Sequence, residues 1–388
     1  MTTTIDNEQK TLKVPNLRFP EFEGEWEEST IEKQFELYSG NTPSRINKEL
    51  FNGTINWISS GELKEHYIYS TKERISQEAA NNLKLLSVGT FVIAIYGLEA
   101  EGVRGTGSIT QEPSTISQAC MAFTPKGEIT NEFLYSWYKK HGNVIGVKYA
   151  QGTKQQNLSY DILEKFKISY PNVKEQDKLN LFFSLIDKRI STQNKIIEDL
   201  KKLKSTISKK LLDNDRWTTH KIQDIAKIGR GRVISSVEIE RQKHPLYPVY
   251  SSQTSNDGIM GYLDDYMFDG EYITWTTDGA NAGTVFYRKG KFNCTNVCGT
   301  LKIQPKYDCY FVSLVLQQAT QKYVSFNLAN PKLMNNIMAS IKIKMPDIEM
   351  QKQLSKIFQT LDSCLLVHQR TCDMYSREKQ YLLCQMFI

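Results

Sequence analysis

The chain has 388 residues, of which 40% are hydrophobic and 24% are charged, and its formal net charge is +6. This composition suits two or three domains with buried cores and excludes a disordered chain. No apolar run approaches the ~18 residues of a membrane span, and the polar residues 1–8 are unlike a secretory signal. The seven cysteines include no Cys-x-x-Cys pair, which argues against disulfide scaffolds and zinc modules. We expect a cytoplasmic protein with no metal site and no membrane contact.

The N-terminal part of the chain divides into an arm and a block. Residues 1–25, rich in Pro and Glu, are expected to form an extended arm. Residues 26–158 have the pattern of a mixed α/β domain, because residues 89–96 are strand-like and residues 131–141 place apolar side chains at helical spacing. The glycine cluster Gly97–Gly107 lacks the Gly-Lys-Ser/Thr that a phosphate loop needs. It therefore predicts a loop without nucleotide chemistry.

The central region, residues 159–216, carries a heptad pattern. Its apolar residues alternate at spacings of four and three over about 40 residues, which is about 60 Å of helix. Such sustained spacing is typical of a coiled coil, and the polar Gln193 and Lys204 within the seam would restrict its register. An ordinary amphipathic helix on a globular core is the alternative. The predicted seam residues are Leu179, Phe183, Ile186, Ile190, Ile197, Leu200 and Ile207.

The second half of the chain follows the same plan. Residues 217–333 form a second mixed block, with a strand-like run at 271–275, a helical pattern at 310–324 and a glycine loop at 279–283. Residues 334–388 form a second heptad region. Its predicted seam residues are Leu354, Phe358, Leu361, Leu365, Tyr375 and Leu382.

Two alignments show that the chain is an internal repeat. Residues 171–212 align without a gap on residues 346–387, and the start of the first block, Trp26-x4-Ile31-x8-Gly40, aligns with Trp217-x4-Ile222-x8-Gly231. A repeat of this length indicates a duplicated structural unit. We therefore predict an α+β fold with two α/β blocks joined by two long helices. The helices would form an antiparallel coiled coil and relate the halves by a pseudo-twofold axis.

No motif in the sequence indicates covalent chemistry. Neither block has the Asp/Asn-Pro-Pro-aromatic motif of amino-methyltransferases, because Asn330-Pro331-Lys332 lacks the second Pro and the aromatic residue. A nuclease would need paired acids and a Lys around a metal, and Asp264-Asp265 fits a solvated turn better. We expect no catalytic residue in this chain.

Polar loop residues at similar places in both blocks are instead candidates for DNA contact. Arg can read guanine, Asn and Gln can read adenine, and Ser mostly holds phosphates. The alternative for each is an ordinary solvated loop. The candidates are Tyr38, Ser39, Asn41, Arg45, Ser59, Ser60, Arg104, Lys154 and Gln155 in the first block, and Arg230, Arg232, Ser251, Ser252, Asn281, Arg288 and Asn296 in the second.

The whole arrangement resembles the specificity (S) subunit of type I restriction–modification systems. The strings that carry the resemblance are Pro15-Asn-Leu-Arg-Phe-Pro-Glu-Phe-Glu-Gly-Glu-Trp26, Gly152-Thr-Lys-Gln-Gln-Asn-Leu158, Ile168-Ser-Tyr-Pro171, and the helix openings Pro171-Asn-Val-Lys-Glu-Gln176 and Pro346-Asp-Ile-Glu-Met-Gln351. The second half departs from the pattern, since Asn327-Leu-Ala-Asn-Pro-Lys332 replaces the Gly-Thr-Lys-Gln string. That departure puts in doubt whether Lys154 and Gln155 have counterparts.

The resemblance implies a non-catalytic, sequence-specific DNA-binding subunit. Each block would be a target recognition domain for one half of a bipartite, gapped target in double-stranded DNA, and the helices would be the spacer. The helices would also carry two methyltransferase (modification) subunits, which restriction subunits join, so that S-adenosylmethionine, ATP and Mg belong to the partners. Two alternatives stay open: a coiled-coil scaffold with two protein- or glycan-binding domains, and a cryptic DNA methyltransferase or nuclease.

Overall fold

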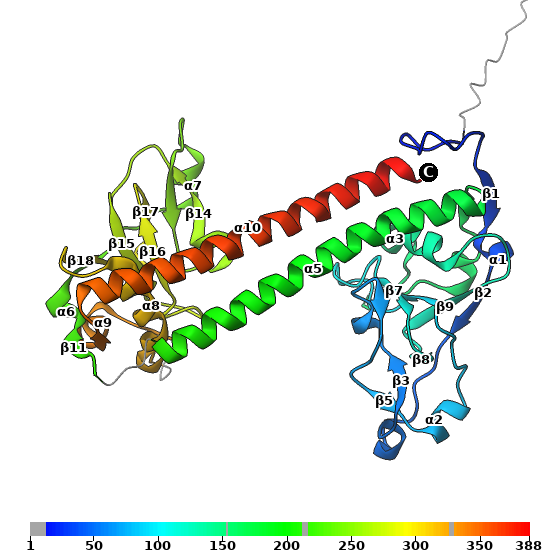
Figure 1. The fold of residues 1–388 in the computed structure, drawn as a ribbon, viewed down its shortest axis with the longest axis horizontal. Helices are drawn as coiled ribbons and strands as arrows, with labels where there is room; N and C mark the ends of the chain where they lie inside the picture. Colours follow the sequence, from blue (N-terminus) through cyan, green and yellow to red (C-terminus); the bar gives the residue numbers. More distant parts are fainter. Residues whose placement is uncertain (1–12, 153, 212–215, 326–329) are drawn as a thin grey trace, which may run out of the picture. The chain divides into compact units, whose positions relative to one another are not determined.

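The computed structural model describes residues 13–152, 154–211, 216–325 and 330–388, and it divides into two compact units. The first unit comprises Met1–Asn194 together with Arg370–Ile388, and the second comprises Lys195–Gln369. Each unit therefore contains one globular block and a segment of both long helices (Figure 1).

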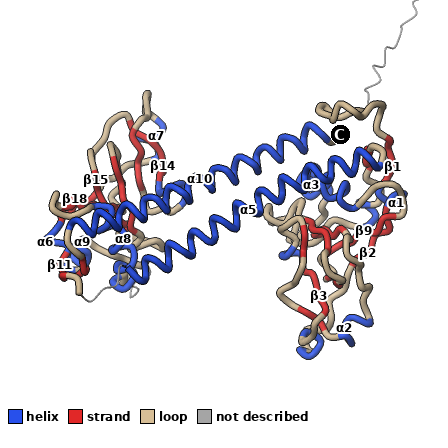
Figure 2. The backbone as a smooth tube through the Cα atoms, viewed as in Figure 1, coloured by secondary structure: helices blue, strands red, loops and turns tan. Residues whose placement is uncertain are grey.

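The first unit is built from two small sheets and a covering helix (Figure 2). Its larger sheet has the strand order β2-β9-β6-β7-β4, its smaller sheet the order β5-β3-β8, and β1 pairs separately with β10. Helix α3 (Asn131–Tyr149) buries Phe133 and Trp137 in the same core as Phe91 of the sheet. The strands are β1 (Glu27–Thr30), β2 (Phe35–Ser39), β3 (Ile55–Ile58), β4 (Tyr67–Ile68), β5 (Arg74–Ile75), β6 (Phe91–Ala94), β7 (Gly107–Thr110), β8 (Ser114–Ile116), β9 (Cys120–Pro125) and β10 (Lys167–Tyr170); the short helices are α1 (Ile31–Gln34), α2 (Gln77–Asn81) and α4 (Tyr160–Leu163).

The second unit repeats this topology with fewer strands. Its sheets have the orders β12-β18-β15-β16 and β14-β13-β17, and β11 pairs with β19 as β1 pairs with β10. Helix α8 (Cys309–Ala319) occupies the place of α3. The strands are β11 (Thr218–Lys221), β12 (Ala226–Arg230), β13 (Tyr247–Tyr250), β14 (Ile259–Leu263), β15 (Glu271–Thr276), β16 (Val285–Lys289), β17 (Asn293–Cys294), β18 (Cys298–Ile303) and β19 (Lys342–Met345); the short helices are α6 (Ile222–Ile225), α7 (Ser236–Glu240) and α9 (Asn335–Ser340).

The two long helices, α5 (Val173–Leu211) and α10 (Ile348–Met386), pair antiparallel in each unit. In the first unit Lys379 of α10 forms an ion pair with Asp187 of α5, and in the second Lys204 of α5 forms one with Asp362 of α10. The repeat places these two lysines at equivalent positions, and likewise the two aspartates. The polar Lys204 in the predicted seam, and its counterpart in α10, thus fix the register by charge.

The predicted seam residues are all buried or half-buried. At the ends of the helices the seam merges with the domain cores, since Leu179 and Phe183 pack in the first core with Phe387, and Leu354 and Phe358 pack in the second. The seam therefore stabilises each unit as part of its core as well as pairing the helices.

A buried glutamine explains the match between the two helix openings. Gln176 accepts a hydrogen bond from the backbone N–H of Thr130, the residue that caps α3, at 3.0 Å, and its amide donates to the Pro171 carbonyl at 2.9 Å. Gln351 makes the same two bonds to Asp308 and Pro346, at 3.0 and 2.9 Å. Each glutamine thus joins a long helix to the start of the helix that covers the sheet.

The predicted α+β fold with a duplicated block and helix is confirmed. The long helices begin later than the predicted helix regions, because residues 159–172 include α4 and β10, and residues 334–347 include α9 and β19. The predicted helix at 310–324 is shorter, since α8 ends at Ala319 and a 3-10 turn follows to Tyr323. Of the predicted arm, residues 1–12 lie outside the described residues. The rest packs on α5, where Arg18 pairs with Glu175 at 2.7 Å. Among the residues that the structure describes, no helix is both long and apolar enough to cross a bilayer.

Candidate nucleic-acid interface

The strands of each unit bring their polar loops to one end of the larger sheet. In the first unit β2 and β6 both run antiparallel to β9, so β2 and β6 end where β9 begins. In the second unit β12 and β15 end where β18 begins. The loops after these strands carry five of the predicted contact residues, Asn41, Arg45, Arg104, Arg232 and Asn281. We call these two sheet ends the loop ends of the units.

A matched glycine defines each loop end. The N–H of Gly40 donates to the Cys120 carbonyl at 3.4 Å, and the N–H of Gly231 donates to the Cys298 carbonyl at 3.1 Å. A Cβ at either glycine would lie 2.1 Å from a backbone carbonyl oxygen, that of Ile116 or that of Cys294. Only glycine therefore permits this close approach of two backbones.

The buried cysteines beside these glycines are structural. Burial raises the pKa of Cys120 to about 12 and that of Cys298 to about 11. Each thiol contacts the hydroxyl group three residues before it, on Ser117 or Thr295, at 3.6 and 4.0 Å. A thiol with so high a pKa is protonated at neutral pH and is a poor nucleophile.

The glycine-rich loops lie against the segments that precede the two helix regions. In the first unit Leu98 N–H donates to the Gln156 carbonyl at 3.1 Å, so the loop that follows β6 touches the Gly152-to-Leu158 string. In the second, Gly279 N–H donates to the Pro331 carbonyl at 3.0 Å. The two loop pairs are counterparts, but residues 326–329, part of the segment that replaces the Gly-Thr-Lys-Gln string in the second half, lie outside the described residues.

Some predicted contact residues of the first unit interact with other residues of the chain, and others are exposed. Arg45 is engaged, because its guanidinium makes a two-pronged ion pair with Glu73 at 2.5 and 2.9 Å and stacks 4.2 Å from the Phe51 ring centre. The hydrogen bonds from Arg45 lower the pKa of Glu73. Tyr38 accepts a hydrogen bond from the Lys84 N–H, Ser59 donates to Glu62, and Arg104 lies half-buried against Gly146. Ser39, Asn41, Lys154 and Gln155 are exposed and Ser60 is half-exposed.

The arginines of the second unit are also engaged. Arg230 donates to the Asn296 carbonyl at 2.5 Å and to Thr277 at 3.1 Å, and Arg232 forms a two-pronged pair with Glu238. Arg288 is buried. Asn281 donates to the Ser252 carbonyl at 3.0 Å, while Ser251 is half-buried. The structure thus gathers these residues near one loop end, with Arg288 beneath it. Their roles in DNA contact stay predictions.

Two features of the units were missed at the level of sequence. One is the turn Ser255-Asn-Asp-Gly258, in which Asn256 and Asp257 have left-handed backbones. Its Asn-Asp-Gly string is a signal for such a turn, but the string alone does not indicate function. The other is a polar cluster around His66, for which no sequence pattern exists because its members come from four separate elements.

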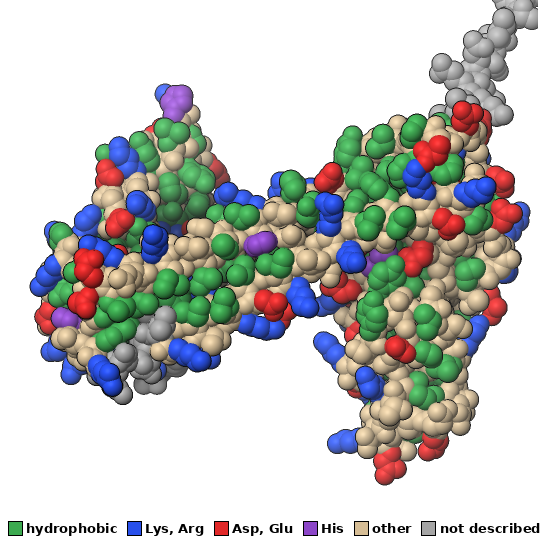
Figure 3. Space-filling view, viewed as in Figure 1, with side chains coloured by type: hydrophobic (Ala, Val, Ile, Leu, Met, Phe, Trp, Pro, Cys, Tyr) green, Lys and Arg blue, Asp and Glu red, His purple; other side chains and the backbone are tan. Residues whose placement is uncertain are grey.

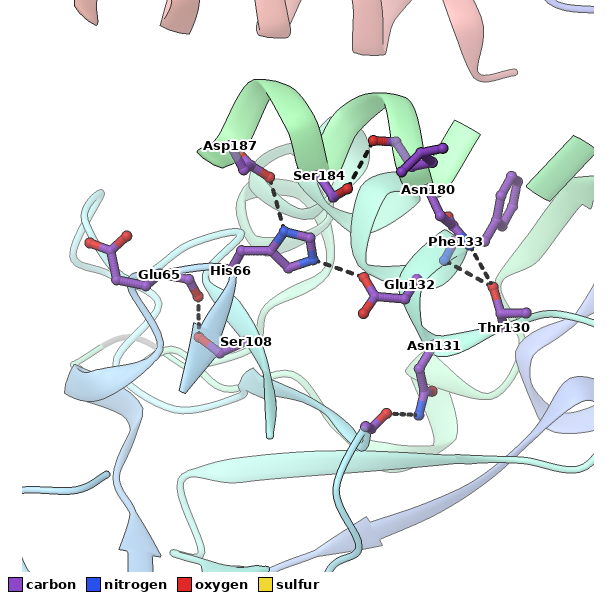
Figure 4. A network of polar contacts seen from close by, with 12 residues as sticks. Glu65, His66, Ser108, Thr130, Asn131, Glu132, Phe133, Asn180, Ser184 and Asp187 are labelled. Carbon is purple, nitrogen blue, oxygen red and sulfur yellow. Dashed lines mark hydrogen bonds and ion pairs between the residues drawn. The ribbon is translucent and has the colours of Figure 1, made fainter. Parts of the chain in front are cut away.

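His66 lies between two carboxylates (Figure 4), and its ring also packs between two aromatic side chains. Its Nε2 is 2.9 Å from Glu132 of α3, and its Nδ1 is 3.0 Å from Asp187 of α5. The imidazole stacks between Tyr67 and Tyr135, with ring centres 4.0 and 3.9 Å away. Asp187 also contacts Lys379 of α10 at 2.5 Å. The cluster thus ties the first block to both long helices.

His66 should make the stability of the first unit depend on pH. Burial alone lowers the pKa of His66, but its contacts with Asp187 and Glu132 outweigh this and raise the pKa overall. A raised histidine pKa adds stability below the unfolded value near 6.5, and this is lost as pH rises through the folded value. The free-energy difference between wild type and His66→Gln, measured by urea unfolding, should therefore be larger at pH 5.5 than at pH 7.5.

The other charged groups of the cluster do not reverse this expectation. Burial and the nearby Lys379 lower the pKa of Lys139 to about 8, and Tyr67 has a pKa raised to about 12. Both groups are present in wild type and variant, so they cancel in the difference. A difference that is equal at the two pH values would show that folding leaves the pKa of His66 unchanged, and a smaller difference at pH 5.5 would show that folding lowers it.

Comparison with known proteins gives consistent matches. A family model described as the type I restriction modification DNA specificity domain matches residues 23–202 and again residues 214–372. A putative type I specificity subunit of Mycoplasma pneumoniae is 34% identical over 241 residues, which is 60% of this chain and 89% of that protein. The specificity subunit of the type I restriction enzyme MpnII from the same organism is 39% identical over 178 residues, 45% of this chain and 53% of that protein.

Solved structures share the fold at low sequence identity. The crystal structure of the S subunit of a type I restriction–modification system from M. genitalium matches with a TM-score of 0.70 at 18% identity, covering 97% of this chain and 99% of that one. A chain from a structural study of complex assembly in the type I system matches with a TM-score of 0.52 at 12% identity. The family model matches both halves of the chain, in agreement with its duplicated unit and its two equivalent loop ends. The chain therefore belongs to the type I restriction–modification DNA specificity family.

Proposed function

We propose that each unit reads one half of a bipartite, gapped DNA target as part of a type I restriction–modification complex. The observation that carries this proposal is the loop end, which is built twice on the same glycine junction but bears different side chains in each copy. A duplicated frame with different loops suits an asymmetric target, because the frame positions the loops and the loops contact the bases.

The long helices would scaffold the partner proteins. Both expose large apolar side chains that the seam does not use, and Figure 3 shows apolar side chains along their visible face. On α10, the exposed Ile357 lines a shallow apolar groove next to the seam residue Leu361. Exposed apolar surface of this kind marks protein–protein contact. We propose two methyltransferase subunits there, with restriction subunits joining them.

The catalytic chemistry would belong to these partners. S-adenosylmethionine, ATP and Mg would bind to the methyltransferase and restriction subunits, and this chain would be the non-catalytic specificity subunit. The formal net charge is only +6, and basic and acidic side chains are mixed on the face drawn in Figure 3, so phosphate attraction by this chain alone would be modest. The complex would act in the cytoplasm, where it meets DNA, and where the seven unpaired cysteines are kept reduced.

Exchange of the first loop should change only one half of the target. Replacing residues 41–46 by the corresponding loop of a relative, with Gly40 kept, leaves the glycine junction intact. Methylation mapping of a genome that carries the chain and its methyltransferase should then show one altered half-site and one unchanged half-site. Loss of both half-sites in a folded variant would contradict independent reading.

A control separates this proposal from its alternatives. The purified chain should transfer no label from S-adenosylmethionine to DNA without a partner, whereas a cryptic methyltransferase would do so. DNA binding by the assembled complex should weaken as salt rises, because phosphate contacts release counterions. A protein- or glycan-binding scaffold would show no DNA binding at any salt concentration.

A further inference from the structure

The turn that joins β13 to β14 has an unusual backbone. Asn256 and Asp257 have φ values of 49° and 53°, and Gly258 follows with a φ of 82°. Asn and Asp adopt left-handed backbone more readily than other residues with a side chain, and they therefore favour tight turns. Two such residues in a row, both exposed, form a turn whose position further contacts can restrain.

Arg288 provides this restraint from beneath the turn. Its Nη1 donates to the Asp257 carboxylate at 2.6 Å and its Nη2 donates to the Asp257 carbonyl at 2.8 Å. The guanidinium also lies 3.6 Å from the centre of the Tyr250 ring. The Arg288 side chain is only 3% exposed, whereas that of Asp257 is 67% exposed. A buried charge is costly unless it is fully bonded, and the hydrogen bonds of Arg288 to Asp257 supply that bonding.

The turn belongs to the loop end of the second unit. Ser251 N–H donates to the Gly258 carbonyl at 2.8 Å, and the Tyr250 carbonyl accepts from Thr295, next to the glycine junction. Asn281, in the glycine-rich loop, donates to the Ser252 carbonyl at 3.0 Å. The turn that carries the exposed Asn256 is thus bonded to the segment of Ser251 and Ser252, which in turn bonds to Asn281.

The first unit has no such device among its described residues. The strand registers place Thr110 of β7 where Arg288 stands in β16. Thr110 is buried and bonds to Ser87 and Thr90. The arginine and its turn are therefore specific to the second block, as a determinant of one half-site would be.

We propose that the turn 255–258 is a specificity-determining element of the second half-site, with Asn256 reading an adenine and Arg288 acting as its positioning residue. This rests on the proposed function. An asparagine amide can both accept from adenine N6 and donate to N7 in the major groove. The fixed backbone would hold this side chain in place before DNA binds, which lowers the entropy cost of binding and increases discrimination between base pairs.

The decisive variant is Asn256→Gly, because glycine tolerates the left-handed backbone. The variant should unfold at the same or a higher urea concentration than wild type. In the assembled complex it should lose about ten- to a hundredfold of its preference for one base pair, in one half-site only. Methylation mapping of a genome with the co-expressed methyltransferase measures this preference.

Arg288→Lys tests the positioning role, with Lys289→Gln as its control. The lysine keeps the charge but cannot make the two-pronged contact with Asp257. The assembled complex should therefore lose its preference at the same base pair of the target. Lys289 is adjacent and 72% exposed, and removing its charge should leave that base pair unchanged. An unchanged motif in Asn256→Gly, or equal weakening of both half-sites, would overturn the proposal while leaving bipartite reading intact. A wild-type complex without any bipartite motif would overturn the proposed function itself.

Discussion

Replacing Asp187 by alanine should lower the free energy of unfolding of the first unit by about 3–5 kcal/mol. Asp187 is the anion that His66 and Lys379 share, and these side chains are only 8% and 14% exposed. Burial alone would raise the pKa of Asp187, but its contacts with His66 and Lys379 lower it overall, so the carboxylate is charged at neutral pH. Removing it leaves the Lys379 ammonium and the His66 imidazole without their shared partner in a site with little access to water.

The internal repeat provides a matched control for this variant. Asp362 is the counterpart of Asp187 in α10, but its side chain is 40% exposed and it contacts Lys204 and the Tyr310 hydroxyl. Asp362→Ala should therefore cost about 1 kcal/mol, as exposed ion pairs do. Hydrogen exchange measured by mass spectrometry shows in which unit the backbone amides lose protection, and so assigns each loss of stability to one unit. Equal losses in the two variants would contradict the special role of the His66 cluster.

The sequence was sufficient to predict the helices because their signal is long and regular. A heptad pattern over about ten turns survives many substitutions, and the duplicated openings around Gln176 and Gln351 marked where each helix starts. What those glutamines do was not predictable, since their partners Thr130 and Asp308 lie more than 40 residues earlier in the chain. The strands were harder, because many have only two to four residues.

The sequence indicated which loops carry polar residues, but not what the side chains of those loops contact. The glycine loops and their polar residues marked the loop ends in both blocks. An arginine that reads a base looks the same in sequence as one that holds a loop, however, and Arg45, Arg232 and Arg288 all face carboxylates of this chain. Only the fold shows which polar residues, such as Asn41 and Asn256, are exposed and bond only to a neighbouring backbone group rather than to a carboxylate.

Replacing Gly231 by alanine should disable the second loop end and cost about 3 kcal/mol or more. A Cβ there would lie 2.1 Å from the Cys294 carbonyl oxygen and 2.4 Å from that of Thr295. Both atoms belong to the backbone, so the strand end and the turn between β17 and β18 would have to separate. Arg230, Arg232 and Asn296 would move with them. In the assembled complex, methylation mapping should show a degenerate second half-site beside an intact first one.

Two further glycines make this prediction specific. Gly40→Ala, in the equivalent junction of the first unit, should degrade the first half-site and spare the second, because its Cβ would meet the Ile116 carbonyl at the same 2.1 Å. Gly102 lies in a loop at the same end of the first unit but has no atom within 4 Å of its Cβ position, so Gly102→Ala should leave both half-sites and the unfolding midpoint unchanged. Loss of base preference at the first half-site in Gly40→Ala and at the second half-site in Gly231→Ala would assign each half-site to one unit. A folded variant of either glycine that lost base preference at both half-sites would show that the two loop ends act as one site. Such a result would exclude reading by independent units.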